Sequence, residues 1–390
     1  MGEILRLPGP IACIVGARPN YMKMAPLVRA FAARPDLPGA VLIHTGQHYD
    51  VAMNERLFAD LELPAPDLNL EVGSGSHAVQ TAEIMRRFDA VMDDLDPSCV
   101  IVVGDVNSTL ACSLVASKRR TPVMHVEAGL RSYDREMPEE INRVLTDQIA
   151  DRLYTTERSA ADNLAREGIP AERICFVGNV MIDSLLQHRE RAVSPAALLS
   201  REGLDPAIVA ASSGYGVVTL HRPSNVDHAD ALNQALSILR EVARRLPLVW
   251  PVHPRTRANI ERFGLSSVIA EAGVHLLPPQ GYLEMVGLMS SARLVLTDSG
   301  GIQEETTALG VPCLTMRENT ERPITVDQGS NTLVGRDAAA VTGCVEEIMQ
   351  GRGKQGRRPE LWDGHAGDRI AADLATWLAR RREHGLLQPA

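Results

Sequence analysis

The stretch "LTDSGGIQEE", residues 296–305, joins the end of an apolar run to a glycine turn and the start of a helical segment. The backbone amides of residues 299–301 would lie at a helix start, where hydrogen bonds and the helix dipole stabilise a diphosphate. A tight strand-to-helix turn would explain the glycines equally well, with Glu304 and Glu305 as favourable charges in the first helical turn. Strand-turn-helix units of this kind build parallel α/β sheets.

The same pattern recurs along the whole chain, where short apolar runs alternate with longer segments of helical period. The candidate strands of the first half are residues 11–16, 40–45, 99–104, 122–127, 152–156 and 174–178. Those of the second half are residues 216–221, 247–252, 274–278, 293–298 and 312–316. We therefore expect an α/β fold with two doubly wound parallel sheets.

The length of 390 residues favours two domains over one, because a single hydrophobic core stops growing near 250 to 300 residues. Residues 188–214 lose periodicity and collect Ser, Pro and Gly, so we expect the hinge there. The expected domains are residues 1–187 and 188–365. A last helix within 366–390 is expected to join the first domain.

The composition excludes several classes of protein. With 49 acidic and 40 basic residues the net charge is −9, which argues against non-specific nucleic-acid binding. The six cysteines lack CxxC spacing, so neither a zinc site nor a disulfide framework is indicated. No apolar run approaches the roughly 20 residues of a membrane helix, and Pro8, Gly9 and Pro10 interrupt the apolar N-terminus. We expect a cytoplasmic protein without membrane contact.

The turn after the first strand reads "GARPNYMK", residues 16–23, and brings two cations to the start of a helix. Arg18 and Lys23 would attract an anion there. The turn is neither G-x-G-x-x-G nor G-x-x-x-x-G-K-[ST], so a dinucleotide site and a Walker site both lose support.

Carboxylates follow two further strands and one helix start. Asp105, Glu127 and Glu139 could converge at one sheet edge, because ligands of open parallel sheets bind beyond the carboxyl ends of the strands. Crowded carboxylates raise one another's pKa and can divide the roles of proton donor and acceptor. Alternatively, Asp105 caps a helix and Glu139 is a solvated residue of a helix start.

The second half places a histidine and an arginine after each of two strands, in "TLHRPSNVD" (219–227) and "PVHPRT" (251–256). A lone histidine at such a place is commonly structural, but His221 beside Arg222 favours function. His44 and His48 have the spacing of a helical metal pair, yet Thr45 and Gly46 break any helix between them, so we expect no metal site.

Taken together, nine motifs resemble the non-hydrolysing UDP-N-acetylglucosamine 2-epimerases, in order from about residue 11 to 335. They are "GARPNYMKMAPL", "TGQHYD", "GDVNSTLA", "HVEAGLRS", "MPEEINR", "GNVMID", "TLHRPSNVD", "TDSGGIQEE" and "ENTERPIT". The resemblance implies a glycosyltransferase-B type fold, in which two Rossmann-like domains face each other across a cleft. It also implies reversible conversion of UDP-GlcNAc to UDP-ManNAc, by anti elimination of UDP to 2-acetamidoglucal and re-addition. No cofactor is implied; the partners implied are a UDP-sugar substrate and a second copy of the chain in a homodimer.

The resemblance also assigns residues one at a time. The catalytic positions are Asp105, Glu127, Glu139 and His221. The substrate-binding positions are Arg18, Lys23, Arg143, Arg222, His253, Met285, Ser299, Gly300, Gly301, Glu305 and Arg322. Among these, the glycine loop is expected to hold the β-phosphate, Glu305 the ribose hydroxyls and Arg322 a phosphate.

The sequence departs from the family in places. "HRPSNVD" replaces the His-Arg-Arg-Glu of the enterobacterial branch. Gln47 and His48 fit an activator site for a second UDP-GlcNAc, but Asp50 stands where a second glutamine is usual, and residues 73–83 contain no arginine. This weakens the expectation of allosteric control.

Other readings remain open at this point. A glycosyltransferase of the same fold would share the UDP site without needing three carboxylates. A hydrolysing epimerase would release free sugar, and a silent binding module would have lost a carboxylate. An epimerase of a UDP-sugar modified at C3 or C6 needs only a few changes in the pocket.

Overall fold

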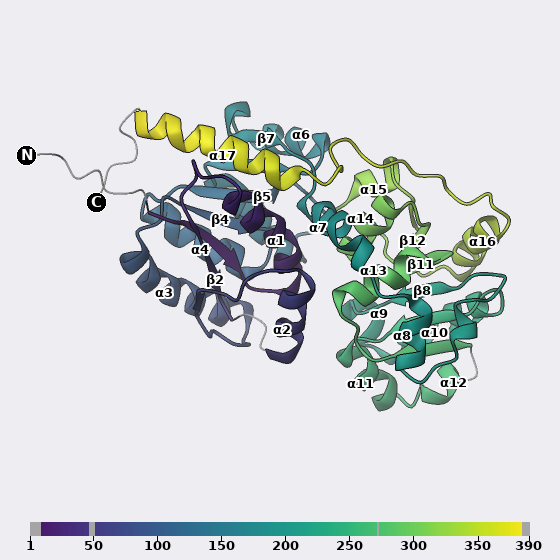
Figure 1. Cartoon of the computed structure of the whole chain (residues 1–390). Helices are drawn as coiled ribbons and strands as arrows, with labels where there is room; N and C mark the ends of the chain where they lie inside the picture. Colours follow the sequence, from purple (N-terminus) through teal and green to yellow (C-terminus); the bar gives the residue numbers. More distant parts are fainter. Residues whose placement is uncertain (1–8, 47–50, 271–272, 384–390) are drawn as a thin grey trace, which may run out of the picture. The chain divides into compact units, whose positions relative to one another are not determined.

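A computed structural model describes residues 9–46, 51–270 and 273–383 of the chain. The chain divides into two compact units (Figure 1). The first unit comprises residues 1–184 and 360–390, and the second comprises residues 185–359.

The first unit contains a parallel sheet in the order β3-β2-β1-β4-β5-β6-β7. Its strands are β1 (Ile11–Val15), β2 (Ala40–His44), β3 (Leu68–Asn69), β4 (Cys99–Val103), β5 (Val123–Ala128), β6 (Arg152–Thr155) and β7 (Ile174–Phe176). Its helices are α1 (Arg18–Ala32), α2 (Val51–Asp60), α3 (His77–Leu95), α4 (Asn107–Lys118), α5 (Pro138–Ile149), α6 (Arg158–Arg166), α7 (Val180–His188) and α17 (Ala366–Glu383), with a 3₁₀ turn η1 (Ala171–Arg173).

The apolar runs of β1, β4 and β5 are buried along their whole length, as expected for central parallel strands covered on both faces. Ile14 of β1 and Val102 of β4 belong to one apolar cluster with Ile84 and Phe88 of α3 and Val115 of α4. Helix α1 contacts β1, β2 and β4. This packing fixes the ends of β1, β4 and β5, where the candidate residues lie.

The last helix, α17, packs on the first unit beside α1 (Figure 1). Asp183 of α7 accepts hydrogen bonds from the backbone amides of Ala366 and Gly367 at the start of α17, at 3.2 and 2.7 Å. The fully buried Trp362 donates from Nε1 to the carbonyl of Thr156 at 3.0 Å. A helix far away in sequence is therefore held by both polar and apolar contacts.

The second unit contains a parallel sheet in the order β10-β9-β8-β11-β12-β13. Its strands are β8 (Gly216–Thr219), β9 (Leu248–Pro251), β10 (Val274–Leu277), β11 (Leu294–Thr297), β12 (Cys313–Thr315) and β13 (Asn331–Leu333). Its helices are α8 (Pro195–Arg201), α9 (Pro223–Val226), α10 (Ala229–Ala243), α11 (Pro254–Arg262), α12 (Ser266–Ala270), α13 (Tyr282–Ser290), α14 (Gly300–Leu309), α15 (Pro323–Asp327) and α16 (Ala338–Met349), with 3₁₀ turns η2 (Arg189–Arg191) and η3 (Pro206–Ile208).

Two apolar clusters cover the two faces of this second sheet. Val218 of β8 packs in a cluster with Leu236 of α10 and Val345 of α16. Val217, the preceding residue, packs in the other cluster with Leu199 of α8 and Leu288 of α13. The alternation along β8 is the period expected of a strand. Part of the stretch 188–214 thus forms α8 and contributes to this core.

Both sheets reverse their strand order at one place, between β1 and β4 in the first unit and between β8 and β11 in the second. In open α/β sheets, ligands bind at such a switch point, beyond the carboxyl ends of the strands. The α/β class with two parallel sheets is confirmed, and each unit has one switch point at which a ligand would be expected to bind. In the described ranges, no helix is long and apolar enough to cross a membrane.

Candidate active site

The turn between β1 and α1 is braced by Asn20. Its Oδ1 accepts hydrogen bonds from the amides of Gly16 and Ala17 at 3.1 and 3.0 Å, and its Nδ2 donates to the carbonyl of Val103 at 3.0 Å. A Cβ on Gly16 would lie 2.0 Å from Oγ of Ser108, so only glycine allows this close approach to α4. The turn places Arg18 half-buried at the first position of α1.

Lys23, one turn further along α1, is buried and forms an ion pair with the buried Glu127 at the end of β5. Glu127 has a left-handed backbone, with φ of 71°, at a place where the β5–β6 register shifts between Val126 and Ala128. Such conformations cost of order 1–3 kcal/mol and cluster at functional sites. The chain therefore holds a strained carboxylate beside a buried cation.

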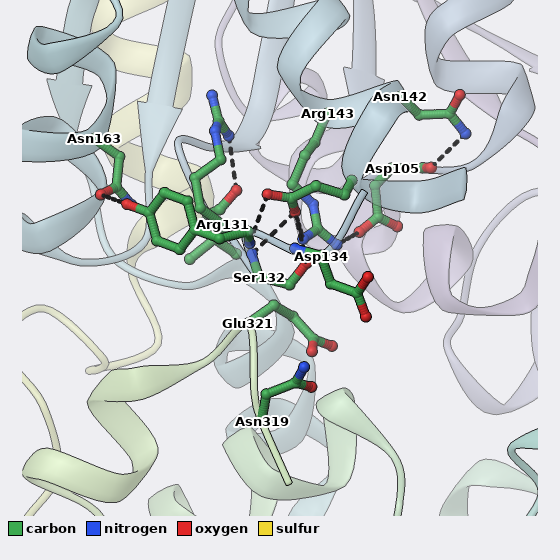
Figure 2. A network of polar contacts seen from close by, with 12 residues as sticks. Asp105, Arg131, Ser132, Asp134, Asn142, Arg143, Asn163, Asn319 and Glu321 are labelled. Carbon is green, nitrogen blue, oxygen red and sulfur yellow. Dashed lines mark hydrogen bonds and ion pairs between the residues drawn. The ribbon is translucent and has the colours of Figure 1, made fainter. Parts of the chain in front are cut away.

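Asp105 follows β4 and is held by Arg143 of α5 (Figure 2). Nη2 of Arg143 lies 2.5 Å from Oδ2 of Asp105, and its Nη1 lies 2.6 Å from Oε2 of Glu140. Asn142 donates to the backbone carbonyl of Asp105 at 2.9 Å. Glu140 also accepts from the amides of Ser132 and Tyr133, both at 2.9 Å. One arginine thus joins the carboxylate after β4 to the loop after β5.

The start of α4 tests the alternative interpretation of Asp105 as a helix cap. Val106, not Asp105, is at the N-cap of α4, so the capping interpretation is wrong. Glu139 is half-buried in the first turn of α5, whereas its neighbour Glu140 is the buried member of the network. Because β4 and β5 pair directly, Asp105, which follows β4, and Glu127, which lies at the end of β5, stand at the ends of neighbouring strands.

In the second unit, Asp298 organises the switch point. This fully buried residue follows β11, and its carboxylate accepts from the amides of His221 and Arg222 at 3.1 and 2.9 Å and from Nδ2 of Asn225 at 3.0 Å. Nδ1 of His221 lies 3.1 Å from the same carboxylate. Burial raises the pKa of Asp298, but the hydrogen bonds from these donors, above all from His221, lower it by more. The net pKa of Asp298 therefore lies below its usual range. Asp298 therefore stays ionised and orients the imidazole of His221.

Two further predicted residues of this unit, His253 and Met285, lie on separate elements. His253 is exposed at the N-cap of α11, where its Nδ1 accepts from the amide of Arg255 at 3.2 Å. Its ring centroid lies 6.2 Å from that of His221, so the two histidines are neighbours. Met285 is half-buried on α13 and packs against the cluster that contains Val217.

The glycine turn begins α14 directly. Ser299 is at the N-cap without a side-chain capping bond, and Gly300 and Gly301 form the first helical positions. A Cβ on Gly300 would lie 2.5 Å from Oε1 of Glu321. The carboxylate of Glu321 therefore lies next to the start of α14, where the helix N-terminus stabilises negative charge.

Three arginines surround Glu321. Nη2 of Arg317 lies 2.9 Å from its Oε2 and Nη2 of Arg222 lies 3.5 Å from its Oε1. Arg322 pairs through Nε with Glu304 at 3.0 Å. Burial raises the pKa of Glu321, but the three guanidinium groups lower it by more. The net pKa of Glu321 therefore lies well below its usual range. This cluster concentrates positive charge at the start of α14.

Glu304 and Glu305 are buried, and α14 begins at Gly300, so they lie in the second turn of the helix and not in the first. Burial and the neighbouring Glu304 raise the pKa of Glu305 to about 8, against a lowering by a hydrogen bond from Tyr282. The interpretation of both as favourable charges in the first helical turn is therefore wrong. Near neutral pH, the carboxyl group of Glu305 holds its proton in a substantial fraction of molecules.

The structure adds residues that sequence reasoning did not select, namely Asn20, Glu140, Asp298 and Glu321. Each stands next to or within a motif already noted, and each is an acid or amide that is buried. Gln47 and His48, which fit an activator site, and Asp50, which departs from it, lie outside the described residues. Within the described parts of the chain, no group of three or more His, Cys, Asp or Glu side chains could hold a metal ion.

The chain is similar to known proteins over most of its length. The family model described as UDP-N-acetylglucosamine 2-epimerase matches residues 30–375. A UDP-N-acetylglucosamine 2-epimerase of Methanococcus maripaludis is 39% identical over 87% of this chain and 92% of its own. A UDP-2,3-diacetamido-2,3-dideoxy-D-glucuronate 2-epimerase of Pseudomonas aeruginosa is 41% identical over 94% of this chain and 99% of its own.

Among solved structures, the Methanocaldococcus jannaschii UDP-GlcNAc 2-epimerase in complex with UDP-GlcNAc and UDP aligns with a TM-score of 0.84 and 38% identity. The alignment covers 94% of this chain and 99% of that one. This likeness confirms the expected fold of two Rossmann-like domains. Together, the family model and these relatives show that the chain belongs to the UDP-N-acetylglucosamine 2-epimerase family.

Proposed function

We propose that the protein interconverts UDP-GlcNAc and UDP-ManNAc without hydrolysing them. The observation that carries this proposal is the buried, strained Glu127, paired with Lys23, on the strand next to the one that Asp105 follows. Inverting C2 requires one group that removes its proton and one that returns a proton to the opposite face. Two carboxylates in different surroundings are suited to such a division of roles.

In this proposal the second unit binds the UDP group of the substrate. The amides of Gly300 and Gly301 and the nearby Arg322 would bind the diphosphate, because hydrogen bonds and positive charge favour it there. Glu305, further along α14, would bind the ribose hydroxyls. His221, oriented by Asp298, would lie at the diphosphate end of the site.

The chemistry then consists of an elimination and its reversal. A carboxylate of the first unit takes the C2 proton, a C1–C2 double bond forms, and the C1–O bond breaks with its electron pair going to UDP. UDP next adds back to C1 of 2-acetamidoglucal while C2 receives a proton on the other face. One proton is removed and one returned, so no electron acceptor is required.

A second candidate substrate has a specific observation in its favour. The Pseudomonas aeruginosa relative, 41% identical, is named for a UDP-sugar that carries an acetamido group at C3 and a carboxylate at C6. We therefore propose C2 epimerisation for either substrate class, with UDP-GlcNAc first.

The test is a comparison of substrates with purified enzyme and no added cofactor. UDP-GlcNAc and UDP-2,3-diacetamido-2,3-dideoxy-glucuronate are incubated separately, and products are resolved by anion-exchange chromatography and NMR. We expect UDP-ManNAc from the first, approached equally from UDP-ManNAc in the reverse direction. Free ManNAc with UDP would instead identify a hydrolysing enzyme, and turnover only in the presence of an acceptor alcohol would identify a glycosyltransferase.

A further inference from the structure

A buried histidine lies behind the proposed carboxylates. His125 of β5 is fully buried, with Nδ1 2.6 Å from Oδ1 of Asp147 and Nε2 2.8 Å from the carbonyl oxygen of Gly104. A carbonyl oxygen can only accept a hydrogen bond, and so can an ionised carboxylate. Both ring nitrogens must therefore donate, which requires a doubly protonated, positively charged imidazole.

Asp147 on α5 has the surroundings of an ionised carboxylate. It is fully buried, and its Oδ2 accepts from the amide of Gly129 at 3.0 Å and lies 2.7 Å from Nη2 of Arg131. Burial raises the pKa of Asp147, but the neighbouring His125 and Arg131 lower it by more. The net pKa of Asp147 therefore lies below its usual range. Arg131 in turn binds the carboxylate of Glu167 at 2.6 and 2.8 Å. The charges of the four side chains thus alternate.

The pair of His125 and Asp147 binds backbone groups next to the two carboxylates of the proposed reaction, Asp105 and Glu127. Gly104, which accepts from His125, directly precedes Asp105. Asp147 binds His125 and Gly129, which stand on either side of Glu127. The left-handed backbone of Glu127 persists only where its surroundings impose it. The pair therefore clamps the end of β4 to the strained end of β5.

We infer that His125 and Asp147 are a charged positioning pair, which fixes Asp105 and Glu127 relative to each other without touching the substrate. The consequence for the rate rests on the proposed function, whereas the charge of His125 does not. A buried ion pair is weak evidence for stability, and in some proteins such a pair serves to specify conformation. Small displacements of acid and base groups are costly, because a shift of about 1 Å can lower a rate about a hundredfold.

The variant Asp147→Asn separates charge from shape. Its amide oxygen can still accept from Gly129 and Arg131, while its NH₂ can donate to Nδ1 of a neutral His125. The matched control is Asp368→Asn, since the exposed Asp368 of α17 pairs at 3.0 Å with His365, which directly precedes the helix. Both changes remove one carboxylate from a histidine–aspartate pair of the first unit.

The first measurement is ¹⁵N NMR of histidine-labelled protein without ligand near neutral pH, with His125 assigned from the His125→Gln spectrum. We expect protons on both ring nitrogens of His125 in the wild type and in Asp368→Asn, and on Nε2 alone in Asp147→Asn. Finding one protonated ring nitrogen in the wild type would overturn the inference. This readout needs no variant to fold well, because the wild-type spectrum alone decides it; where His125→Gln does not fold, through-bond correlations assign the ring.

The second measurement is steady-state kinetics with UDP binding. We expect kcat of Asp147→Asn to fall about tenfold or more, with the Kd for UDP within about twofold of wild type, and no change in Asp368→Asn. An unchanged kcat in Asp147→Asn, with the Nδ1 proton lost, would refute the positioning role. If the wild type showed no epimerisation, the proposed function would fail, and the positioning role with it, while the nitrogen spectrum would still decide the charge of His125.

Discussion

Gly300 and Glu321 lie so close that a Cβ on Gly300 would be 2.5 Å from Oε1 of Glu321. The carboxylate thus stands at the start of α14, above the amides proposed to bind diphosphate. The side chain of Glu321 and the bound phosphate would compete for the same positive charge.

Gly300→Ala is expected to weaken UDP binding by about tenfold, or about 1.4 kcal/mol. The added methyl group would displace Glu321 and crowd the space in front of the amides. Isothermal titration calorimetry with UDP measures the effect. Gly343→Ala on α16 is the matched control, because a Cβ there meets nothing within 4 Å; equal affinities in the two variants would contradict the assignment of the loop.

Glu321→Gln is expected to tighten UDP binding by about three- to tenfold at low salt, because one negative charge leaves the cluster of arginines. The gain should shrink as the salt concentration rises. Glu318→Gln, an exposed residue of the same loop, should change affinity much less. Weaker UDP binding in Glu321→Gln would show instead that the carboxylate braces the arginines.

Glu305 predicts a pH dependence of stability. Its pKa is raised to about 8 on folding, from roughly 4.3 in an unfolded chain, so the folded state binds the proton more tightly. Its contribution to stability is fully present below pH 4.3 and is lost as pH rises through about 8.

Glu305→Gln should therefore gain stability relative to wild type at pH 9, by about 1 to 3 kcal/mol, and little at pH 5. Urea denaturation at the two pH values measures the difference. Glu347→Gln, an exposed residue of α16, provides the control. A difference between Glu305→Gln and wild type that does not depend on pH would contradict the raised pKa of Glu305.

Arg143→Lys should lower both stability and activity. A lysine presents a single point charge and cannot bond Asp105 and Glu140 together as the planar guanidinium does. We expect a loss of about 2 to 4 kcal/mol in the free energy of unfolding, because a buried carboxylate loses its partner. Arg135→Lys in the exposed part of the preceding loop is the control; equal stability of the two variants would argue against the network.

The main features of the fold could be predicted from the sequence, because most strands are apolar runs bounded by turns. The exceptions are β3 and β13, which have two and three residues and lie at sheet edges. Their residues, LN and NTL, form no apolar run, whereas β7 and β12, which also have three residues, lie within longer apolar runs.

The sequence predicted which candidate residues stand at the end of a strand, as with Asp105, Glu127 and Ser299. Sequence could not distinguish Glu139 from Glu140, because neighbouring helical residues differ only in the side of the helix they occupy, about 100° apart. The contacts of Asp147 and Glu321 were equally hidden, since they depend on burial and on partners more distant in the chain.

The central claim is that C2 loses and regains a proton while the nucleotide returns to C1. Incubating the enzyme with UDP-GlcNAc in D₂O and following C2 by ¹H NMR tests it most directly. We predict UDP-ManNAc carrying deuterium at C2, and loss of this exchange in both Asp105→Asn and Glu127→Gln. Recovery of unlabelled UDP-GlcNAc alone, release of only free sugar and UDP, or wild-type exchange in both variants would contradict the account.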